Sequence, residues 1–216
     1  MAKRQVKIVA IGLGNRTCKY LRYVKEHEDV VRLVAIVEPD KERLSAVREL
    51  FQLPAAVCFT DVSEFFTSDI QVDACIIGTP DKLHFDIAMR AMERGWAILL
   101  EKPISQTFDE CKEVARAAEE KGLLVSICYV LRYHPYFIKM HELSKDPQMG
   151  RILKVTHIEK VGKDRTAHTY VRGPWNKEEM GTTVFLSKCC HDVDFVLWLV
   201  GNDVKTVRST GIENHF

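Results

Sequence analysis

Two glycines that follow a short apolar stretch are the first residues of this sequence with a chemical signature. Five of the six residues at 6–11 are apolar, and the run leads into Gly12-Leu13-Gly14-Asn15-Arg16-Thr17. A buried strand that enters such a turn before a helix can bind a pyrophosphate, because Gly14 has no Cβ and the first helical N–H groups face the phosphates. Thr17 replaces the third glycine of the G-x-G-x-x-G pattern, where close helix–strand packing can accept a small side chain. An ordinary strand–turn–helix corner has the same pattern, so the motif needs support from other residues.

Glu38 supports a nucleotide site through its distance from the glycines. It lies 24 residues after Gly14, directly after the mainly apolar run at 30–37. A carboxylate at the end of a second strand can accept hydrogen bonds from the adenosine ribose hydroxyls. It also repels a 2′-phosphate, and no arginine directly follows it, so the pattern predicts NAD in preference to NADP. The alternative is a solvated carboxylate at a strand end.

Lys102 and His191 have side chains suited to hydride transfer from an alcohol, which needs a group that takes the hydroxyl proton beside a fixed nicotinamide. Lys102 follows the apolar run at 96–100, where the nicotinamide end of the cofactor should lie. An ammonium there can polarise the substrate oxygen. His191 can relay a proton near neutral pH, and Asp194 shares its helix face at i+3. The alternatives are a surface lysine paired with Glu101 and a structural histidine.

Two further cations are candidates for contact with a polar substrate. Lys188 lies three residues before His191, so on a helix it can assist as an acid or an anion clamp, or it can be a solvated lysine. Arg132 can contact the substrate or the cofactor, or it can form an interdomain ion pair.

The residues Cys189, Cys190, His191 and Asp194 raise the question of a metal site. Adjacent cysteines on a helix project about 100° apart, so both cannot easily bind one ion. No distant C-x-x-C supplies further ligands. We therefore expect no metal site from this cluster.

Alternating strands and helices are expected to position the candidate residues. Six strands are expected, at 6–11, 30–37, 56–59, 72–78, 96–100 and 123–128. Helices separate most of these strands, and two of the helices begin at capping boxes, at 61–64 and 107–110. The alternation predicts an α/β fold, with a doubly wound parallel sheet in residues 1–128.

The ends of the expected strands carry four of the candidate residues. Gly12, Glu38, Thr79 and Lys102 each follow a strand directly or by one or two residues. Ligands on parallel sheets bind at the carboxyl ends of the strands. This coincidence is stronger evidence for a nucleotide site than the glycine motif.

From residue 129 the pattern changes and predicts a second domain over 129–216. Its expected elements are a helix at 133–145, a strand at 152–161, a polar loop at 163–179, a helix at 183–200 and a strand at 204–209. The strand at 152–161 alternates as in an open sheet. So few strands leave this domain apparently unfinished.

The composition indicates a soluble globular protein and argues against several partners. The 216 residues include 31 basic and 30 acidic side chains, and no basic stripe indicates nucleic acid or an anionic membrane. No apolar run approaches the ~20 residues of a membrane span, and the first apolar run is too short for a signal peptide. Seven scattered cysteines suit reduced thiols, which predicts a cytoplasmic protein.

Several motifs together resemble one enzyme family. They are Gly12-Leu13-Gly14-Asn15-Arg16, Thr79-Pro80 with His84, Glu101-Lys102-Pro103, Arg132-Tyr133-His134-Pro135, Gly150-Arg151-Ile152-Leu153-Lys154-Val155, and His191 with Asp194. The chain resembles the glucose–fructose oxidoreductase and inositol dehydrogenase family (Gfo/Idh/MocA) over nearly its whole length. The Glu-Lys-Pro motif is the specific part of this likeness, and the glycine turn is not.

The resemblance implies a fold, a reaction and a set of site residues. Members have an NAD(P)-binding Rossmann domain and an α+β second domain with an open, mainly antiparallel sheet, and they oxidise or reduce sugars and cyclitols. Because their chains continue beyond the position of Phe216, we expect a fragment with a partial second domain, and a homo-oligomer in the full-length form. The implied cofactor-binding residues are Gly12, Gly14, Asn15, Arg16, Glu38, Thr79, Pro80, His84, Glu101 and Lys102.

The sequence departs from the family pattern at the helix that carries His191. Dehydrogenases of the family often have D-x-G-x-H, whereas here Ser187 replaces the aspartate and Cys189 replaces the glycine. This departure puts the usual pairing of aspartate with histidine in doubt. The loop at 168–175 resembles a subgroup feature and indicates no particular substrate.

The sequence therefore predicts an NAD-dependent oxidoreductase that acts on a hydroxyl of a sugar, cyclitol or related polyol. Lys102 and His191 would contact the reacting oxygen, and Lys188, Asp194 and Arg132 are further candidates. One alternative is an NAD-dependent enzyme of the same family that cleaves glycosides. Another is a regulatory protein that binds NAD without catalysis. Under the leading prediction, the partner of this protein is a small sugar or polyol substrate. Neither nucleic acid nor a membrane is expected as a partner.

Overall fold

The computed structural model describes residues 4–162, 164, 167, 182–183 and 185–211. The chain divides into two compact units, of which unit 1 comprises residues 1–128 and 161–188 and unit 2 comprises residues 129–160 and 189–216. The predicted domains, 1–128 and 129–216, stay a prediction. The units follow the same boundary at residue 128, but residues 161–188 group with unit 1. Within the described part of the chain, no helix combines the length and the apolar character that crossing a membrane requires.

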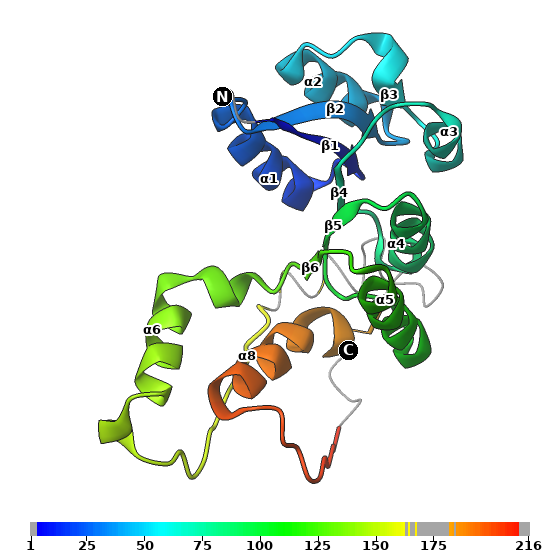
Figure 1. The fold of residues 1–216 in the computed structure, drawn as a ribbon. Helices are drawn as coiled ribbons and strands as arrows, with labels where there is room; N and C mark the ends of the chain where they lie inside the picture. The colour runs from blue at the N-terminus through cyan, green and yellow to red at the C-terminus, as the bar shows by residue number, and fades with distance from the viewer. Residues whose placement is uncertain (1–3, 163, 165–166, 168–181, 184, 212–216) are drawn as a thin grey trace. The chain divides into compact units, whose positions relative to one another are not determined.

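Unit 1 is built on a parallel sheet of six strands in the order β3-β2-β1-β4-β5-β6 (Figure 1). The strands are β1 (Val6–Ile11), β2 (Val31–Val37), β3 (Cys58–Phe59), β4 (Ala74–Ile77), β5 (Ala97–Leu100) and β6 (Val125–Ile127). All five pairings between neighbours are parallel. The prediction of a six-stranded parallel sheet is confirmed, and its strand order is that of the doubly wound dinucleotide-binding fold.

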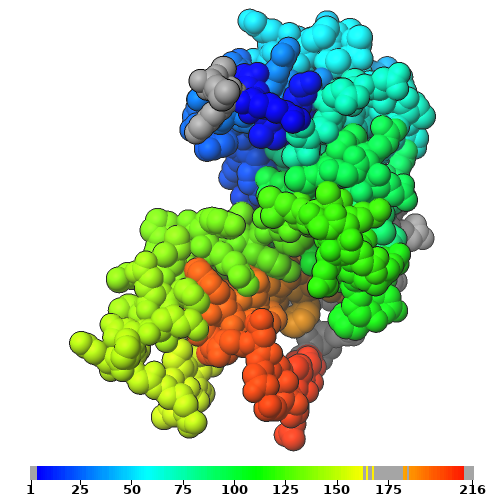
Figure 2. All heavy atoms as spheres, in the orientation of Figure 1, coloured from blue at the N-terminus to red at the C-terminus, as the bar shows by residue number. Residues whose placement is uncertain are grey.

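Helices cover both faces of this sheet because its strands are apolar on both sides. The helices are α1 (Asn15–Glu26), α2 (Lys41–Phe51), α3 (Val62–Thr67), α4 (His84–Glu93) and α5 (Phe108–Lys121). Ile8 and Ala10 of β1 belong to the core beneath α1 and α2, whereas Val9 and Ile11 belong to the core beneath α3, α4 and α5. In Figure 2 these parts of unit 1, coloured blue to green, form one continuous packed body.

The helix ends follow from local side-chain chemistry. The Asp61 carboxylate accepts a hydrogen bond from the Glu64 N–H at 2.9 Å, and the Thr107 hydroxyl accepts one from the Glu110 N–H at 3.3 Å. Each such cap stabilises its helix by about 1 kcal/mol. Gly122 ends α5 with φ +61°, in the left-handed region that favours glycine. Both expected capping residues are therefore confirmed.

Unit 2 contains two helices that pack through aromatic rings. It is formed by η3 (Val130–Tyr133), α6 (Pro135–Ser144), η4 (Pro147–Met149) and α8 (Cys190–Val200). Phe137 of α6 meets Phe195 of α8 with ring centroids 4.7 Å apart, and His141 stacks on Trp198 at 4.0 Å. The helix expected at 133–145 is thus present as α6, preceded by a 3₁₀ turn.

Two expectations for the second half of the sequence differ from the structure. The described residues at 152–161 and 204–209 form neither helix nor strand, so the antiparallel sheet is not confirmed. A strand is stabilised by pairing with a neighbour, and the described residues supply no partner strand there. The helix expected at 183–200 is not α-helical throughout, because a π-helix, η7 (Phe185–Cys189), precedes α8. Most of the expected loop at 163–179, with 168–175, lies outside the described residues.

Candidate active site

A cleft of about 830 Å³ lies at the carboxyl ends of β1, β2 and β4. Its lining includes seven of the predicted cofactor-binding residues, namely Gly12, Gly14, Asn15, Arg16, Glu38, Thr79 and Pro80. The other three, His84, Glu101 and Lys102, are not part of this lining. The parallel sheet therefore gathers residues from three separate loops at one place, and three of the four strand-end candidates line it, whereas Lys102 does not.

The glycine turn has a backbone that only glycine fits at its first position. Gly12 has φ +81°, and a Cβ added there would lie 2.7 Å from the carbonyl oxygen of Gly78. Gly14 is the N-cap residue of α1 and has no side chain, so no N-cap side chain accepts a hydrogen bond from the first N–H groups of that helix. A Cβ on Gly14 would meet only the Gly78 oxygen, at 3.9 Å. The open space beside Gly14 is a cradle that fits a phosphate group.

Thr17 occupies the third glycine position because a different glycine supplies the room. Its side chain is fully buried, and a Cβ added to Gly78 would lie 2.1 Å from the Thr17 hydroxyl oxygen. Gly78 follows β4, which pairs with β1, so helix α1 can approach the sheet there. The structure thus explains why the imperfect glycine motif still permits close helix–strand packing.

Glu38 joins the end of β2 to the glycine turn. Its buried carboxylate accepts hydrogen bonds from the Leu13 N–H at 2.6 Å and from the Asp40 N–H at 3.1 Å. Each oxygen keeps a lone pair for a further donor such as a ribose hydroxyl. Arg43 also lines the cleft and lies 3.6 Å from the Asp40 carboxylate. Sequence reasoning looked only at the residues directly after Glu38 and therefore missed this arginine.

The segment after β4 places the cleft residue Thr79 five residues before a buried histidine, His84, at the start of α4. The Thr79 hydroxyl oxygen is buried and has no hydrogen-bond partner among the described residues. His84 is 1% exposed, with Nδ1 2.7 Å from the carbonyl oxygen of Pro103 and Nε2 3.0 Å from that of Thr79. His84 therefore contacts the protein backbone on both sides of its ring.

Lys102 follows β5 and binds the segment that carries the family's histidine. Its Nζ donates a hydrogen bond to the carbonyl oxygen of Ser187 at 2.8 Å. Ser187 is buried in η7 and stands where the family pattern has an aspartate. The Lys102 ammonium thus contacts a backbone carbonyl of η7.

Glu101 is buried beside Lys102 and satisfied by protein donors. Its carboxylate accepts a hydrogen bond from the Tyr20 hydroxyl at 2.5 Å and lies 3.8 Å from the Arg16 guanidinium. Burial, with hydrogen bonds to Cys128 and Glu101, raises the pKa of Tyr20 far above its usual range, so the phenol stays protonated. Burial also raises the pKa of the Cys128 thiol to about 11. The sequence carried no signal for Tyr20, because its partners are distant along the chain.

Arg132 and Asp194 are partners in unit 2. The guanidinium donates two hydrogen bonds to the carboxylate, at 2.9 and 2.7 Å, and these bonds raise the pKa of Arg132. The His191 ring meets Tyr129 edge-on, with centroids 6.0 Å apart. Lys188 belongs to η7 and so is not on a continuous α-helical face with His191. The approach of Lys102 and His191 to one substrate oxygen stays a prediction, because they belong to different units.

Residues 6–129 match the model of the oxidoreductase family with an NAD-binding Rossmann fold, GFO_IDH_MocA. The chain belongs to this family. Its Gfo/Idh/MocA relatives include 2,7-anhydro-N-acetylneuraminate hydratase of Mediterraneibacter gnavus, 26% identical over 96% of this chain and 53% of the relative. They also include the NAD(+)-dependent scyllo-inositol 2-dehydrogenase of Bacillus subtilis, 24% identical over 97% of this chain and 58% of the relative.

Solved structures share the fold of this Gfo/Idh/MocA chain. Myo-inositol 2-dehydrogenase from Lactobacillus plantarum has a TM-score of 0.77 at 18% identity, covering 92% of this chain and 57% of that structure. Scyllo-inositol dehydrogenase from Lactobacillus casei, with bound NAD(H) and scyllo-inositol, has a TM-score of 0.76 at 16% identity, covering 92% and 57%. The chain thus spans little more than half the length of these relatives.

Proposed function

We propose that this chain carries the cofactor site and part of the catalytic site of an NAD-dependent oxidoreductase that acts on a sugar, cyclitol or related polyol hydroxyl. One observation carries the proposal. The glycine turn, Glu38 and Thr79 line one cleft at the strand ends, where ligands of parallel sheets bind. Membership of the NAD-binding family supports the same conclusion.

The residues of the cleft fit the parts of the cofactor. Glu38 would accept hydrogen bonds from the adenosine ribose, and the N–H groups of Asn15 and Arg16 would face the pyrophosphate. The Thr79 hydroxyl would provide a polar contact further along the cleft. His84 and Glu101 would support the site without contacting the cofactor directly, since both already form hydrogen bonds with protein atoms.

Lys102 would act on the substrate oxygen. Bound NAD supplies the hydride acceptor. The ammonium has three donors, and the Ser187 carbonyl uses one of them, so two can reach the substrate hydroxyl. His191 would relay the hydroxyl proton, with Lys188 as a second candidate. Arg132, held by Asp194, would orient the helix that carries His191.

The test measures NAD reduction with a panel of cyclitols and sugars in the full-length protein. Replacing Lys102 with alanine should lower turnover by ~100-fold or more while NAD still binds, the usual scale for lost acid–base catalysis. Lys121→Ala, a lysine at the end of α5, is the matched control. Turnover that survives Lys102→Ala would remove Lys102 from the mechanism.

A second candidate is a reaction without net oxidation. The relative from Mediterraneibacter gnavus is named a hydratase, so the family includes a reaction that adds or removes water. A glycoside-cleaving enzyme would likewise release product without accumulating NADH. Product analysis separates these cases, and NAD binding without turnover of any substrate would favour a regulatory protein.

We also infer the setting in which the protein works. All seven cysteines are free, which suits a reducing cytoplasm. Like the cytoplasmic setting, a homo-oligomer in the full-length form is a proposal, and size-exclusion chromatography with light scattering would test it.

A further inference from the structure

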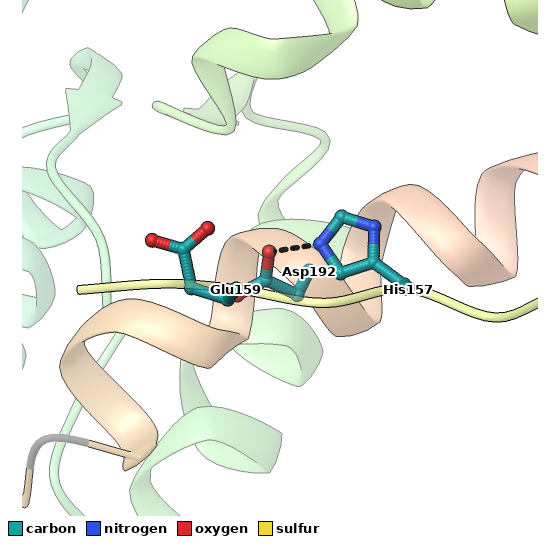
Figure 3. A group of neighbouring side chains, drawn as sticks. All are labelled: His157, Glu159 and Asp192. Carbon is teal, nitrogen blue, oxygen red and sulfur yellow. Dashed lines mark hydrogen bonds and ion pairs between the residues drawn. The ribbon is translucent and has the colours of Figure 1, made fainter.

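A group of metal-ligating side chains lies in unit 2, and none of its members is among the residues that line the cleft of unit 1. Figure 3 shows the His157 ring and the Asp192 carboxylate pointing toward one another, with Glu159 two residues further along the segment that carries His157. His157 Nε2 lies 2.5 Å from an Asp192 carboxylate oxygen. One ligand atom from each of the three residues lies within 4.8 Å of the other two.

The surroundings of Asp192 favour a cation. Its side chain is 13% exposed, and its second carboxylate oxygen is buried. No described residue forms a hydrogen bond of normal geometry with this oxygen. The thiol of Cys189, one turn earlier, lies close enough to interact with the Asp192 carboxylate. Burial and the negative charges of Asp192 and Glu159 raise the pKa of this thiol. The group therefore combines two carboxylates with the imidazole of His157.

We propose that His157, Glu159 and Asp192 bind one divalent transition-metal ion, for which Zn²⁺ is the best match. An imidazole nitrogen with two carboxylate oxygens is a zinc ligand set, whereas Mg²⁺ and Ca²⁺ take oxygen ligands. Ligands about 2.0–2.1 Å from a tetrahedral ion lie about 3.3 Å apart, a spacing that small side-chain movements would give.

The fourth position of a tetrahedral ion has a candidate ligand in Cys189. Cys189 lies three residues before Asp192 in the sequence, and its sulfur is a ligand type that Zn²⁺ accepts. A water molecule is the alternative occupant. In either case the ion would join the segment at 151–160 to helix α8 and would stabilise unit 2.

The inference differs from the metal cluster considered in the sequence. Adjacent cysteines and His191 are not needed as ligands, because His157 and Glu159 come from a segment remote in sequence from α8. The alternative without a metal is a simple ion pair between His157 and Asp192, with Glu159 exposed to solvent. The experiment therefore has to separate metal binding from ion pairing.

The experiment titrates the chelator-treated chain with Zn²⁺, Mn²⁺ and Mg²⁺ by isothermal calorimetry. We expect one Zn²⁺ per chain, weaker Mn²⁺ and no Mg²⁺ binding. His157→Gln and Glu159→Gln should each weaken Zn²⁺ binding at least tenfold, whereas His27→Gln, the same change in unit 1, should leave it unchanged. Both test residues are exposed, so the variants should fold, and circular dichroism checks this.

Co²⁺ absorption provides a second readout. Binding at this site should give visible bands that His157→Gln removes, and Cys189→Ser should remove any sulfur-to-metal charge-transfer band without abolishing binding. Absence of Zn²⁺ binding would overturn the proposal. So would Zn²⁺ binding that folded His157→Gln and Glu159→Gln variants retain in full.

Discussion

The contact between Thr17 and Gly78 allows a sharp test of how the imperfect glycine motif packs. In Gly78→Ala the new Cβ would lie 2.1 Å from the Thr17 hydroxyl oxygen but 3.4 Å from the Thr17 Cβ. The first distance is a severe clash, and the second is close to an ordinary contact. Removing the hydroxyl by Thr17→Ala should therefore make room for the methyl group of Gly78→Ala.

The magnitudes follow from this geometry. Overpacking a dense core costs about 1–3 kcal/mol, so Gly78→Ala alone should lower the free energy of unfolding by that amount. Thr17→Ala should be nearly neutral, because the lost methyl burial of about 0.8 kcal/mol is offset by removal of a buried hydroxyl without a partner in the described structure. The double variant should then lie close to Thr17→Ala. The coupling energy between the two sites should be about 1–3 kcal/mol.

Urea unfolding of the four proteins, followed by circular dichroism, measures this cycle. NAD titration of the same proteins tests the function of the turn, and Gly78→Ala should weaken binding more than the double variant. If the two substitutions instead add within about 0.5 kcal/mol, the residues do not compete for the same space. That result would refute our account of Thr17 at the third glycine position.

Three further predictions concern the same unit. Glu38→Ala should weaken NADH binding by ~1–3 kcal/mol, because a hydrogen bond to a charged group is lost, and should bring the affinities for NADH and NADPH closer together. If the unchanged protein binds NADPH as tightly as NADH or more tightly, the preference for NAD is wrong. Gly12→Ala should destabilise the chain by about 2–5 kcal/mol, combining strain at φ +81° with a Cβ 2.7 Å from a backbone oxygen, whereas Gly95→Ala, with φ +73° and open space, should cost only about 1–2 kcal/mol in the same urea assay. Similar losses at both glycines would show that strain alone acts. Tyr20→Phe should lower stability by about 1–3 kcal/mol, since it removes a donor from the buried Glu101 carboxylate, and an unchanged melting temperature would rule out that role.

Local patterns in the sequence were sufficient to predict the six-stranded parallel sheet of unit 1. Apolar runs between helical segments gave all six strands, and Asp61 and Thr107 marked helix starts through side chains that act within three residues. The strand ends then placed Glu38 near the glycine turn, because parallel topology brings those ends to one edge of the sheet. These features depend on short-range chemistry and on a single topological rule.

Contacts between distant residues could not be predicted in the same way. Lys102 and Ser187 are 85 residues apart, and His157 and Asp192 are 35 apart, so no periodic pattern connects them. The role of Gly78 becomes visible only when β4 pairs with β1. The strand expected at 152–161 was inferred from alternation alone, which describes a strand's faces but supplies no pairing partner.

The position of His84 has a mechanical consequence for any reaction at this site. Its ring lies between the carbonyl oxygens of Thr79 and Pro103. Thr79 lines the cofactor cleft, and Pro103 directly follows Lys102. Each ring nitrogen lies within hydrogen-bond distance of one of these oxygens, so the ring contacts both segments of backbone. A shift of the cleft loop when a nucleotide enters would therefore be passed through this ring to the backbone beside Lys102. Binding of the cofactor and the orientation of Lys102 would therefore be coupled through His84.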